Sequence, residues 1–230
     1  MRTILTTLIL LSLVMPARAW HDRTHIAVAR ASGYDRWYNS TGADMAKMKA
    51  GKRESYNHYF DNTSNKEVTP LMVIDQAGRY NSPDDPEGHL YGAIIGALRD
   101  YVNVKRRGRY AEYHLAFAIH YMTDLCQPLH NMPFDRFNRS HHDDFDGVVD
   151  KEVLNNLDKI KRHMKPVVIR PGHLEVDVAR EVARVANISR RLGKRLKDEG
   201  RVISKEEAYG QLGLCASLIK GVLGALREVK

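Results

Sequence analysis

Two His-x-x-x-Asp pairs lie close together in the middle of the chain. The first is His120 with Asp124 and the second is His142 with Asp146, and a further histidine, His130, lies between them. Residues four apart on a helix lie on the same face, so each pair presents an imidazole beside a carboxylate. Imidazole nitrogen and carboxylate oxygen are both zinc ligands. The pattern therefore predicts a site for several metal ions, with metal-assisted hydrolysis as its chemistry.

The surroundings of the first pair strengthen this prediction. A lone His-x-x-x-Asp is more often a surface pair or a capped turn than a metal site. The segment 115–122, however, is apolar apart from His120, and unpaired polar groups are costly to bury there. Pro128 should end this helix and turn the chain, so that His130 comes back towards the helix end.

The segment 1–19 has the pattern of a secretory signal peptide. Arg2 precedes an apolar run over 4–15, and Ala17-Arg18-Ala19 follows as an Ala-x-Ala cleavage site. We therefore expect an exported protein, periplasmic or extracellular. Cleavage would leave Trp20 as the first residue, and its free amine could become a metal ligand near a divalent cation. Judged from its spacing alone, Trp20 is better explained by packing against the core.

The remaining chain, 20–230, is long enough to form one domain with a good core. It holds 34 Lys and Arg against 28 Asp and Glu, a net charge of +6, because two of the 36 basic residues lie in 1–19. This balance favours anionic partners such as phosphate esters, nucleic acid or an acidic membrane surface, but any basic exported protein would show it. Export permits a disulfide between Cys126 and Cys215, yet Cys126 could equally be a small buried hydrophobe, so their pairing stays open.

Helical periodicity dominates the chain. The only plausible strand is Val167-Val168-Ile169, and the segment 34–68 is polar and irregular. These patterns predict an all-α protein with a single compact multi-helix domain, whose ligands project from helices and the loops between them. Apolar residues recur at three- and four-residue intervals over 22–32, 69–80, 87–104, 109–126, 143–164, 174–198 and 204–228.

Two further polar residues lie in the segment 34–68. Taken alone, Asp44 is best explained as an exposed acid at a helix start, and His58 as a histidine packed beside two aromatic residues. His141 is adjacent to His142, but the helical register that pairs His142 with an aspartate leaves His141 off the cluster.

Together these residues resemble the zinc-dependent phospholipase C family of bacteria, whose superfamily includes the exported single-strand nucleases of fungi and plants. The family pattern is Trp as the first mature residue, then His, Asp, His, His-x-x-x-Asp, His and a final His-x-x-x-Glu or His-x-x-x-Asp. The matched span of this chain runs over 20–150, with His21 as an alternative to His25. The residues that follow the pattern are Trp20, His25, Asp44, His58, His120, Asp124, His130, His142 and Asp146.

The resemblance implies an all-helical fold with a trinuclear zinc cleft. It also implies that Asp44 orients or deprotonates the attacking water. The implied ligand sets are Asp44, His58 and His120 with Asp124 as a bridge; Asp124, His25 and the Trp20 terminus; and His130, His142 and Asp146.

The local sequence favours the phospholipase branch. The segment 58–61, the turn 126–130 and the segment 142–150 look closest to it. The choline-headgroup residues of that branch are not reproduced, since Arg23 stands where an acid is expected. The resemblance therefore implies no preference for phosphatidylcholine. The glycine-rich insertion of the nucleases before the last histidine pair is also missing.

Other residues support the nuclease branch. The five-residue gap from Trp20 to His25 is typical of it, and Lys47 could contact a phosphate. Tyr59 and Asp61 could stack on a nucleic-acid base and hydrogen-bond to it, although Tyr59 would also fit in the core.

We expect an exported zinc-dependent phosphodiester hydrolase that resembles phospholipase C and cleaves a phospholipid headgroup phosphoester. A single-strand nuclease of the same superfamily is the alternative, and a non-catalytic zinc-binding exported protein is the second alternative. The expected partner is a phospholipid or another phosphodiester, with nucleic acid only under the nuclease alternative. Contact with a membrane surface fits this expectation, while the chain after residue 19 should hold no transmembrane segment and should act as a monomer.

Overall fold

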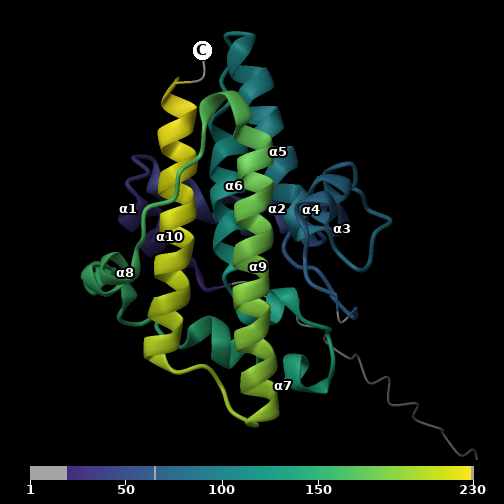
Figure 1. The fold of residues 1–230 in the computed structure, drawn as a ribbon, viewed down its shortest axis with the longest axis vertical. Coiled ribbons are helices and arrows are strands. Elements are labelled where there is room, and N and C mark those ends of the chain that lie inside the picture. Colours follow the sequence, from purple (N-terminus) through teal and green to yellow (C-terminus); the bar gives the residue numbers. More distant parts are fainter. Residues whose placement is uncertain (1–19, 65, 229–230) are drawn as a thin grey trace, which may run out of the picture.

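The computed structural model describes residues 20–64 and 66–228, and within these ranges it is all-helical, as predicted (Figure 1). The predicted signal peptide, 1–19, lies outside the described residues. The α-helices are α1 (Asp22–Ser32), α2 (Gly42–Ala50), α3 (Lys52–Ser55), α4 (Pro70–Ala77), α5 (Leu90–Arg106), α6 (Glu112–Leu125), α7 (Arg136–Gly147), α8 (Leu157–His163), α9 (Leu174–Asp198) and α10 (Lys205–Glu228). The 3-10 helices are η1 (Trp37–Thr41), η2 (Pro128–Asn131), η3 (Val153–Asn155) and η4 (Pro171–His173).

The long helices form the body of the molecule. α9 and α10 run antiparallel along its length, and α5 and α6 lie behind them (Figure 1). α6 contacts α1, α2, η1, η2, α9 and α10, so the helix with the first His-x-x-x-Asp pair is surrounded by other elements. The last residues of α6, from Leu115 on, are almost all buried.

Glycines let α5 approach its neighbours closely. A Cβ atom on Gly92 would lie 2.1 Å from the backbone carbon of Gln76, and one on Gly96 would lie 2.4 Å from the Tyr80 ring. Since real Cβ atoms do not approach backbone so closely, a larger residue at Gly92 would push α4 away from α5. The two glycines therefore hold α4 and the turn after it against the core.

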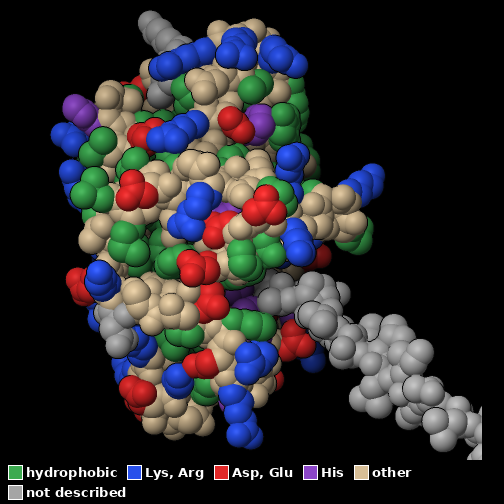
Figure 2. Space-filling model, turned by 90° about the vertical axis from the view of Figure 1, so that its right-hand side faces the viewer, with side chains coloured by type: hydrophobic (Ala, Val, Ile, Leu, Met, Phe, Trp, Pro, Cys, Tyr) green, Lys and Arg blue, Asp and Glu red, His purple; other side chains and the backbone are tan. Residues whose placement is uncertain are grey.

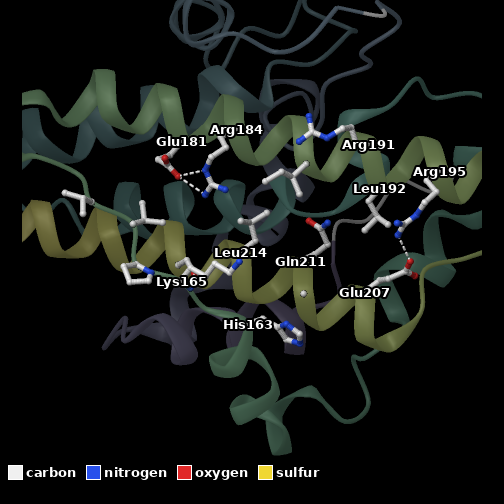
Figure 3. A pocket seen from close by; sticks show the side chains of 16 residues that line it. His163, Lys165, Glu181, Arg184, Arg191, Leu192, Arg195, Glu207, Gln211 and Leu214 are labelled. Atoms are coloured by element: carbon white, nitrogen blue, oxygen red, sulfur yellow. Dashed lines mark hydrogen bonds and ion pairs between the residues drawn. The ribbon is translucent and has the colours of Figure 1, made fainter.

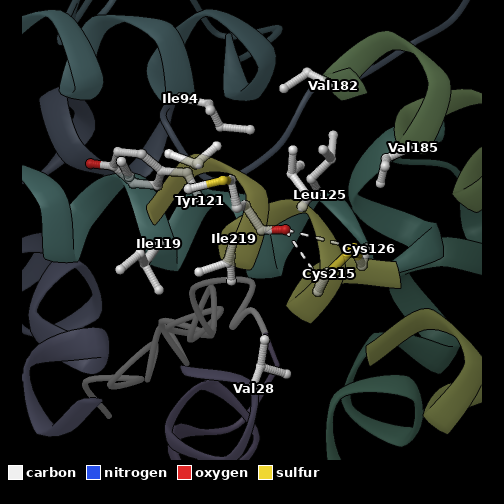
Figure 4. Packing of buried hydrophobic residues seen from close by; sticks show 14 of the residues in the cluster. Val28, Ile94, Ile119, Tyr121, Leu125, Cys126, Val182, Val185, Cys215 and Ile219 are labelled. Carbon is white, nitrogen blue, oxygen red and sulfur yellow. Dashed lines mark hydrogen bonds between the residues drawn. A yellow bond between two sulfur atoms is a disulfide. The ribbon is translucent and has the colours of Figure 1, made fainter. Parts of the chain in front are cut away.

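A disulfide joins the two cysteines whose pairing the sequence left open. Cys126 follows the last residue of α6, and Cys215 lies in the middle of α10. Their Cα atoms are 6.0 Å apart, although 89 residues separate them in the sequence. Buried Leu125 and Ile219 lie among the apolar side chains around this bridge (Figure 4). The bridge therefore ties the ligand-bearing end of α6 to the C-terminal helix.

The prediction of one helix over 143–164 was wrong. α7 begins earlier, at Arg136, and ends at Gly147, and the separate α8 covers Leu157–His163. Asp135 starts α7, because its side chain accepts a hydrogen bond from the Asn138 backbone N–H at 3.1 Å. The first turns of α7 are so polar that apolar periodicity does not reveal them.

Two other segments also differ from expectation. Within the described residues no strand is formed, and the segment 167–169 has no regular secondary structure. The segment 34–68 is less irregular than its composition suggested, because it contains η1, α2 and α3. Gly51, with φ of 56°, makes the break between α2 and α3.

In the described part of the chain, α10 alone has the length and hydropathy that would allow a helix to cross a membrane. Two-thirds (67%) of its apolar window is buried inside the domain. This burial is what a core helix of a globular domain requires.

Candidate metal centre

Eight of the nine residues that follow the family pattern come together in three groups of histidine and aspartate side chains. In each group the ligand-type atoms lie within 4.8 Å of one another, which would allow a metal ion to be held there. They come from α1, α2, the loop after α3, α6, η2 and α7. The groups are His25, Asp44 and His120; His58, His120 and Asp124; and His130, His142 and Asp146.

Asp124 lies at the middle of the first two groups and is fully buried. Its Oδ2 is 2.8 Å from His58 Nδ1 and 3.4 Å from His120 Nε2, and its Oδ1 is 3.3 Å from His25 Nε2. The His25 and His120 rings stack with centroids 3.8 Å apart. One carboxylate thus faces three imidazoles, which is the arrangement of a bridging ligand.

Asp44 closes the same cluster from α2. Its Oδ1 is 3.6 Å from His120 Nε2, 3.7 Å from His58 Nδ1 and 2.6 Å from Lys47 Nζ. Its side chain is 24% exposed, whereas the side chains of His58 and His120 are 2% and 0% exposed. Asp44 and His58 each had a simpler explanation when taken alone, but the fold places both in the cluster. Solvent reaches the first two groups from the side of Asp44.

The third group joins η2 to α7. The Nε2 atoms of His130 and His142 are 3.1 Å apart, and His142 Nε2 is 3.6 Å from Asp146 Oδ2. Gln127 donates to Asp146 Oδ1 at 2.7 Å and so holds that carboxyl group in place. α6 ends at Leu125, three residues before the proline that was predicted to end it. Pro128 starts η2, and this turn brings His130 back beside the end of α6 and beside α7.

Hydrogen bonds on the outer side of the rings decide which nitrogen faces inward. His120 Nδ1 is 2.7 Å from the Ser40 carbonyl oxygen, and His130 Nδ1 is 2.6 Å from the His58 carbonyl oxygen. A carbonyl oxygen only accepts, so Nδ1 carries a proton, and in the neutral ring the lone pair of Nε2 points into the cluster. His142 Nδ1 contacts Asn138 Oδ1 at 2.7 Å in the same manner. Metal-binding histidines are typically held in this way.

Several buried atoms of the cluster have no hydrogen-bond partner. They include His25 Nε2, His120 Nε2, Asp124 Oδ1 and Asp146 Oδ2. His25 Nε2 lies within ion-pair distance of Asp124 Oδ1, but without the geometry of a hydrogen bond. Buried polar atoms are nearly always satisfied, and a nitrogen lone pair repels a carboxylate unless a cation lies between them. The residues present therefore fit a metal centre.

The electrostatic surroundings of His120 and His130 also fit a metal centre. Burial lowers the pKa of His120, but Asp124 and Asp44 outweigh burial and raise it to about 9. Two acids thus favour positive charge at the position between them. In the third group, burial and His142 lower the pKa of His130 to about 3, which keeps that ring neutral and able to act as a ligand.

Trp20 lies beside the third group. It is fully buried, and the backbone N–H of His21 donates to the Asp146 carbonyl oxygen at 3.5 Å. The His21 ring packs over Gly147, 3.3 Å from where a Cβ atom of that residue would lie. His25, rather than His21, is therefore the histidine of α1 that belongs to the cluster.

The predicted substrate residues have different surroundings. Lys47 is at the centre, in contact with Asp44. Tyr59 donates to the Pro86 carbonyl oxygen at 3.1 Å, and Asp61 accepts from the Phe134 backbone N–H at 3.1 Å. The last two thus connect neighbouring loops, and their contact with a base stays a prediction.

Outer residues that hold the ligands were missed by sequence reasoning. They are Ser40, Glu54, Gln127 and Asn138. A signal was present for two of them, because Glu54 and Asn138 each lie four residues before a ligand histidine and face it on the same side of the chain. The Ser40 carbonyl leaves no such signal, because any residue type offers the same oxygen.

A groove of about 990 Å³ lies between α9 and α10, but it holds none of the predicted ligands (Figure 3). Two of its basic side chains pair with acids of the groove, Arg184 with Glu181 at 2.8 Å and Arg195 with Glu207 at 2.7 Å. Lys165 and Arg191 leave the lining with more basic than acidic groups. On the face shown in Figure 2, acidic side chains lie across the middle, whereas Lys and Arg are dense at both ends.

Comparison of this chain with protein-family models, with curated proteins and with solved structures finds no match.

Proposed function

We propose that this protein is an exported zinc-dependent phosphodiester hydrolase of the phospholipase C type. One observation carries the proposal: three neighbouring groups of His and Asp, buried apart from the partly exposed Asp44, lie around or beside the carboxylate of Asp124. Outer hydrogen bonds set the inward nitrogens of His120 and His130. Imidazole and carboxylate are zinc ligands, and neighbouring metal ions are typical of sites that hydrolyse phosphoesters, such as those of phosphatases and nucleases. The order of the ligands along the chain, which resembles the phospholipase C and nuclease superfamily, supports the same function.

The charges of the centre suit a phosphodiester. Three zinc ions would bring +6, against −3 from Asp44, Asp124 and Asp146. A net charge of +3 attracts the phosphodiester and stabilises the negative charge that grows in its transition state. When bound, zinc would supply Lewis-acid polarisation of the phosphoryl group and would lower the pKa of a water.

The residues of the chain would divide the remaining work. Asp44 is the most accessible carboxylate of the centre and would orient the attacking water. Burial alone would raise the pKa of Asp44, but His120 and Lys47 hold it below its usual range, so the group stays an acceptor. Lys47 lies beside it and would contact a phosphate oxygen. The amine of Trp20, once freed, would complete the ligands of His25 and Asp124.

The surface next to Asp44 favours a phospholipid as the substrate. Met45 and Met48 lie on the same side of α2 and are 65% and 83% exposed. The neighbouring Lys49 and Lys52 are also exposed. Apolar side chains flanked by lysines are suited to contact an acidic phospholipid surface.

Parallel assays on one zinc-loaded preparation of residues 20–230 test this function. The substrates are phosphatidylcholine, phosphatidylethanolamine and phosphatidylinositol vesicles, single-stranded DNA and RNA. We expect diacylglycerol release, its loss with chelator and its return with zinc. Release of 5′-nucleotides instead would support the nuclease alternative. Zinc bound without activity on any substrate would support the non-catalytic alternative, and no zinc at all would refute the metal centre.

The role of the Trp20 amine has its own test. A protein that begins Met-Trp20 should lose the amine ligand and hold one of its zinc ions more weakly. Metal content after dialysis, with an extra residue at the C-terminus as the control, measures this effect. Equal zinc content and activity in both proteins would exclude the amine as a ligand.

A further inference from the structure

Glu54 is a buried acid that the family pattern does not include. It lies in α3, four residues before His58, and is 4% exposed. Its Oε1 is 3.2 Å from His58 Nε2 and accepts from the Tyr121 hydroxyl at 2.6 Å. Asn57 Nδ2 donates to its other oxygen at 3.3 Å. The carboxyl group thus contacts His58 on the side of the ring that faces away from the cluster.

His58 differs in orientation from the other histidines held by outer hydrogen bonds. His120 and His130 donate from Nδ1 to backbone carbonyls and present Nε2 to the cluster. His58 presents Nδ1, which is 2.8 Å from Asp124 Oδ2, and its outer contact is the carboxyl group of Glu54. If Nε2–H donates to Glu54, the Nδ1 lone pair faces the cluster.

A chain of polar contacts holds Glu54 in place. Asn57 Oδ1 is 2.8 Å from His89 Nε2, and His89 Nδ1 is 2.8 Å from Asp85 Oδ2. Arg79 pairs with Asp85 at 3.0 Å and reaches the surface. α3 is only four residues long, and so short a helix is not rigid by itself. The contacts supply the rigidity that a precise position of the carboxyl group needs.

We infer that Glu54 is a positioning residue of the metal centre, which fixes the tautomer and the orientation of His58. A carboxylate on the outer N–H also makes the inner nitrogen a stronger ligand. The inference rests on the proposed metal centre and adds a residue outside its ligand shell. An apolar residue at position 54 would also leave the Tyr121 hydroxyl and the Asn57 amide without this acceptor, so a test has to separate positioning from stability. The contact with His58 gives Glu54 a function that such a replacement would remove.

Zinc affinity in the variant Glu54→Gln tests the inference. The amide keeps the shape of the side chain and removes the negative charge. Competition with a chelator should show one of the three zinc ions held 10- to 100-fold more weakly, with the other two unchanged. The matched control is Glu67→Gln, because the Glu67 side chain is 76% exposed and contacts Arg191 rather than the centre.

Two measurements separate positioning from a general loss of stability. ¹⁵N spectra of the histidine rings of zinc-loaded protein should show His58 bound through Nδ1 in wild type, and a changed His58 signal in Glu54→Gln. The melting temperature of metal-free protein records any structural damage. Should Glu54→Gln fail to fold, Tyr121→Phe removes only the hydroxyl that donates to Glu54 and should weaken the same zinc ion several-fold.

The possible outcomes are distinct. Wild-type zinc affinity and an unchanged His58 signal in both variants would overturn the role of Glu54 and leave the proposed function intact. A wild-type protein that binds no zinc would refute the proposed function itself.

Discussion

Individual histidines in this protein are distinguished less by their burial than by what their outer nitrogen contacts. His89 is as deeply buried as His120, yet both its nitrogens contact polar side chains, Asp85 and Asn57, that belong to a supporting network. His120 has one nitrogen on a backbone carbonyl and the other directed at two carboxylates. The inward nitrogen of His120 thus faces the side chains of the other candidate ligands, whereas both nitrogens of His89 are bound within the supporting network.

Two adjacent histidines provide a test at the residue scale. His142→Asn should remove a ligand from the third group and reduce bound zinc from about three to about two ions per chain. His141→Asn should leave the zinc content unchanged, because the partly exposed His141 ring packs beside Phe137 and contacts Asp144 at 3.6 Å rather than the third group. Metal analysis of both dialysed variants measures the difference, and equal zinc loss in the two would contradict the assignment.

Short elements and their caps decide where the ligands lie. η2 brings His130 to α7, and α7 exists where it does because Asp135 caps it. A cap also starts α10. The Ser204 hydroxyl accepts from the backbone N–H of Glu207, and the Glu207 carboxylate accepts from the backbone N–H of Ser204, which is a capping box. Arg201 donates to both oxygens of Glu207 at 2.8 and 2.9 Å, which links this cap to the end of α9.

The close approach of α4 and α5 gives a prediction at the element scale. Gly92→Ala should lower the free energy of unfolding by about 1–3 kcal/mol, because the new methyl group would overlap the Gln76 backbone. Gly224→Ala in α10 is the matched control, since a Cβ atom there meets nothing within 4 Å. It should raise stability by up to about 1 kcal/mol. Urea unfolding of metal-free protein compares the two variants. If Gly92→Ala left the free energy of unfolding unchanged, α4 and α5 would be able to move apart at no cost.

Stability should depend on pH through the α10 cap. The hydrogen bonds from Arg201 hold the pKa of Glu207 below its usual range. A lowered acid pKa stabilises the fold above the unfolded pKa, about 4.3, and this contribution is lost as the pH falls further. Glu207→Gln should therefore cost about 0.5–2 kcal/mol at pH 7, and the cost should shrink towards pH 2.

Unfolding of metal-free protein across this pH range measures the effect. Glu206→Gln is the control, because the Glu206 side chain is 82% exposed and takes no part in the cap. A cost for Glu207→Gln that stays constant with pH would exclude the ion pair as its cause.

At the scale of the whole molecule, the disulfide and the candidate metal centre are joined through α6. Cys126 directly follows the helix that carries His120 and Asp124, and its partner lies in α10. The closed loop is long, so the bridge removes much freedom from the unfolded chain. The C-terminal helix thus supports the centre although it contributes no ligand.

Breaking the bridge tests this connection. The double variant Cys126→Ser and Cys215→Ser should be about 2–4 kcal/mol less stable, which corresponds to a fall in melting temperature of roughly 5–15 °C. Calorimetry with and without reductant measures it. Reductant should lower the melting temperature of the wild type towards that of the double variant and leave the double variant unchanged. If reductant left the melting temperature of the wild type unchanged, the role of the bridge would be contradicted.

Much of this protein was predictable from local sequence. The ranges of α1, α9 and α10 were predicted to within a residue, because apolar periodicity and the breaks after each helix are local properties. The spacing of His120 and Asp124 likewise sets their common face on a helix. α7 escaped prediction because its first turns carry almost no apolar residues, so that its start depends on a single cap.

Only the tertiary structure decided how the pieces meet. The contact of His58 with Asp124 joins residues 66 apart in the sequence, and no local pattern encodes it or the contact of His58 with Asp44. The pairing of Cys126 with Cys215 was open for the same reason. Glu54 and His58 are only four residues apart, but the role of their contact depends on which nitrogen of His58 faces the other ligands, and packing decides that. Residue types and periodicity determine which side chains can bind a metal and on which helices they lie; packing between distant helices determines which of them share one site.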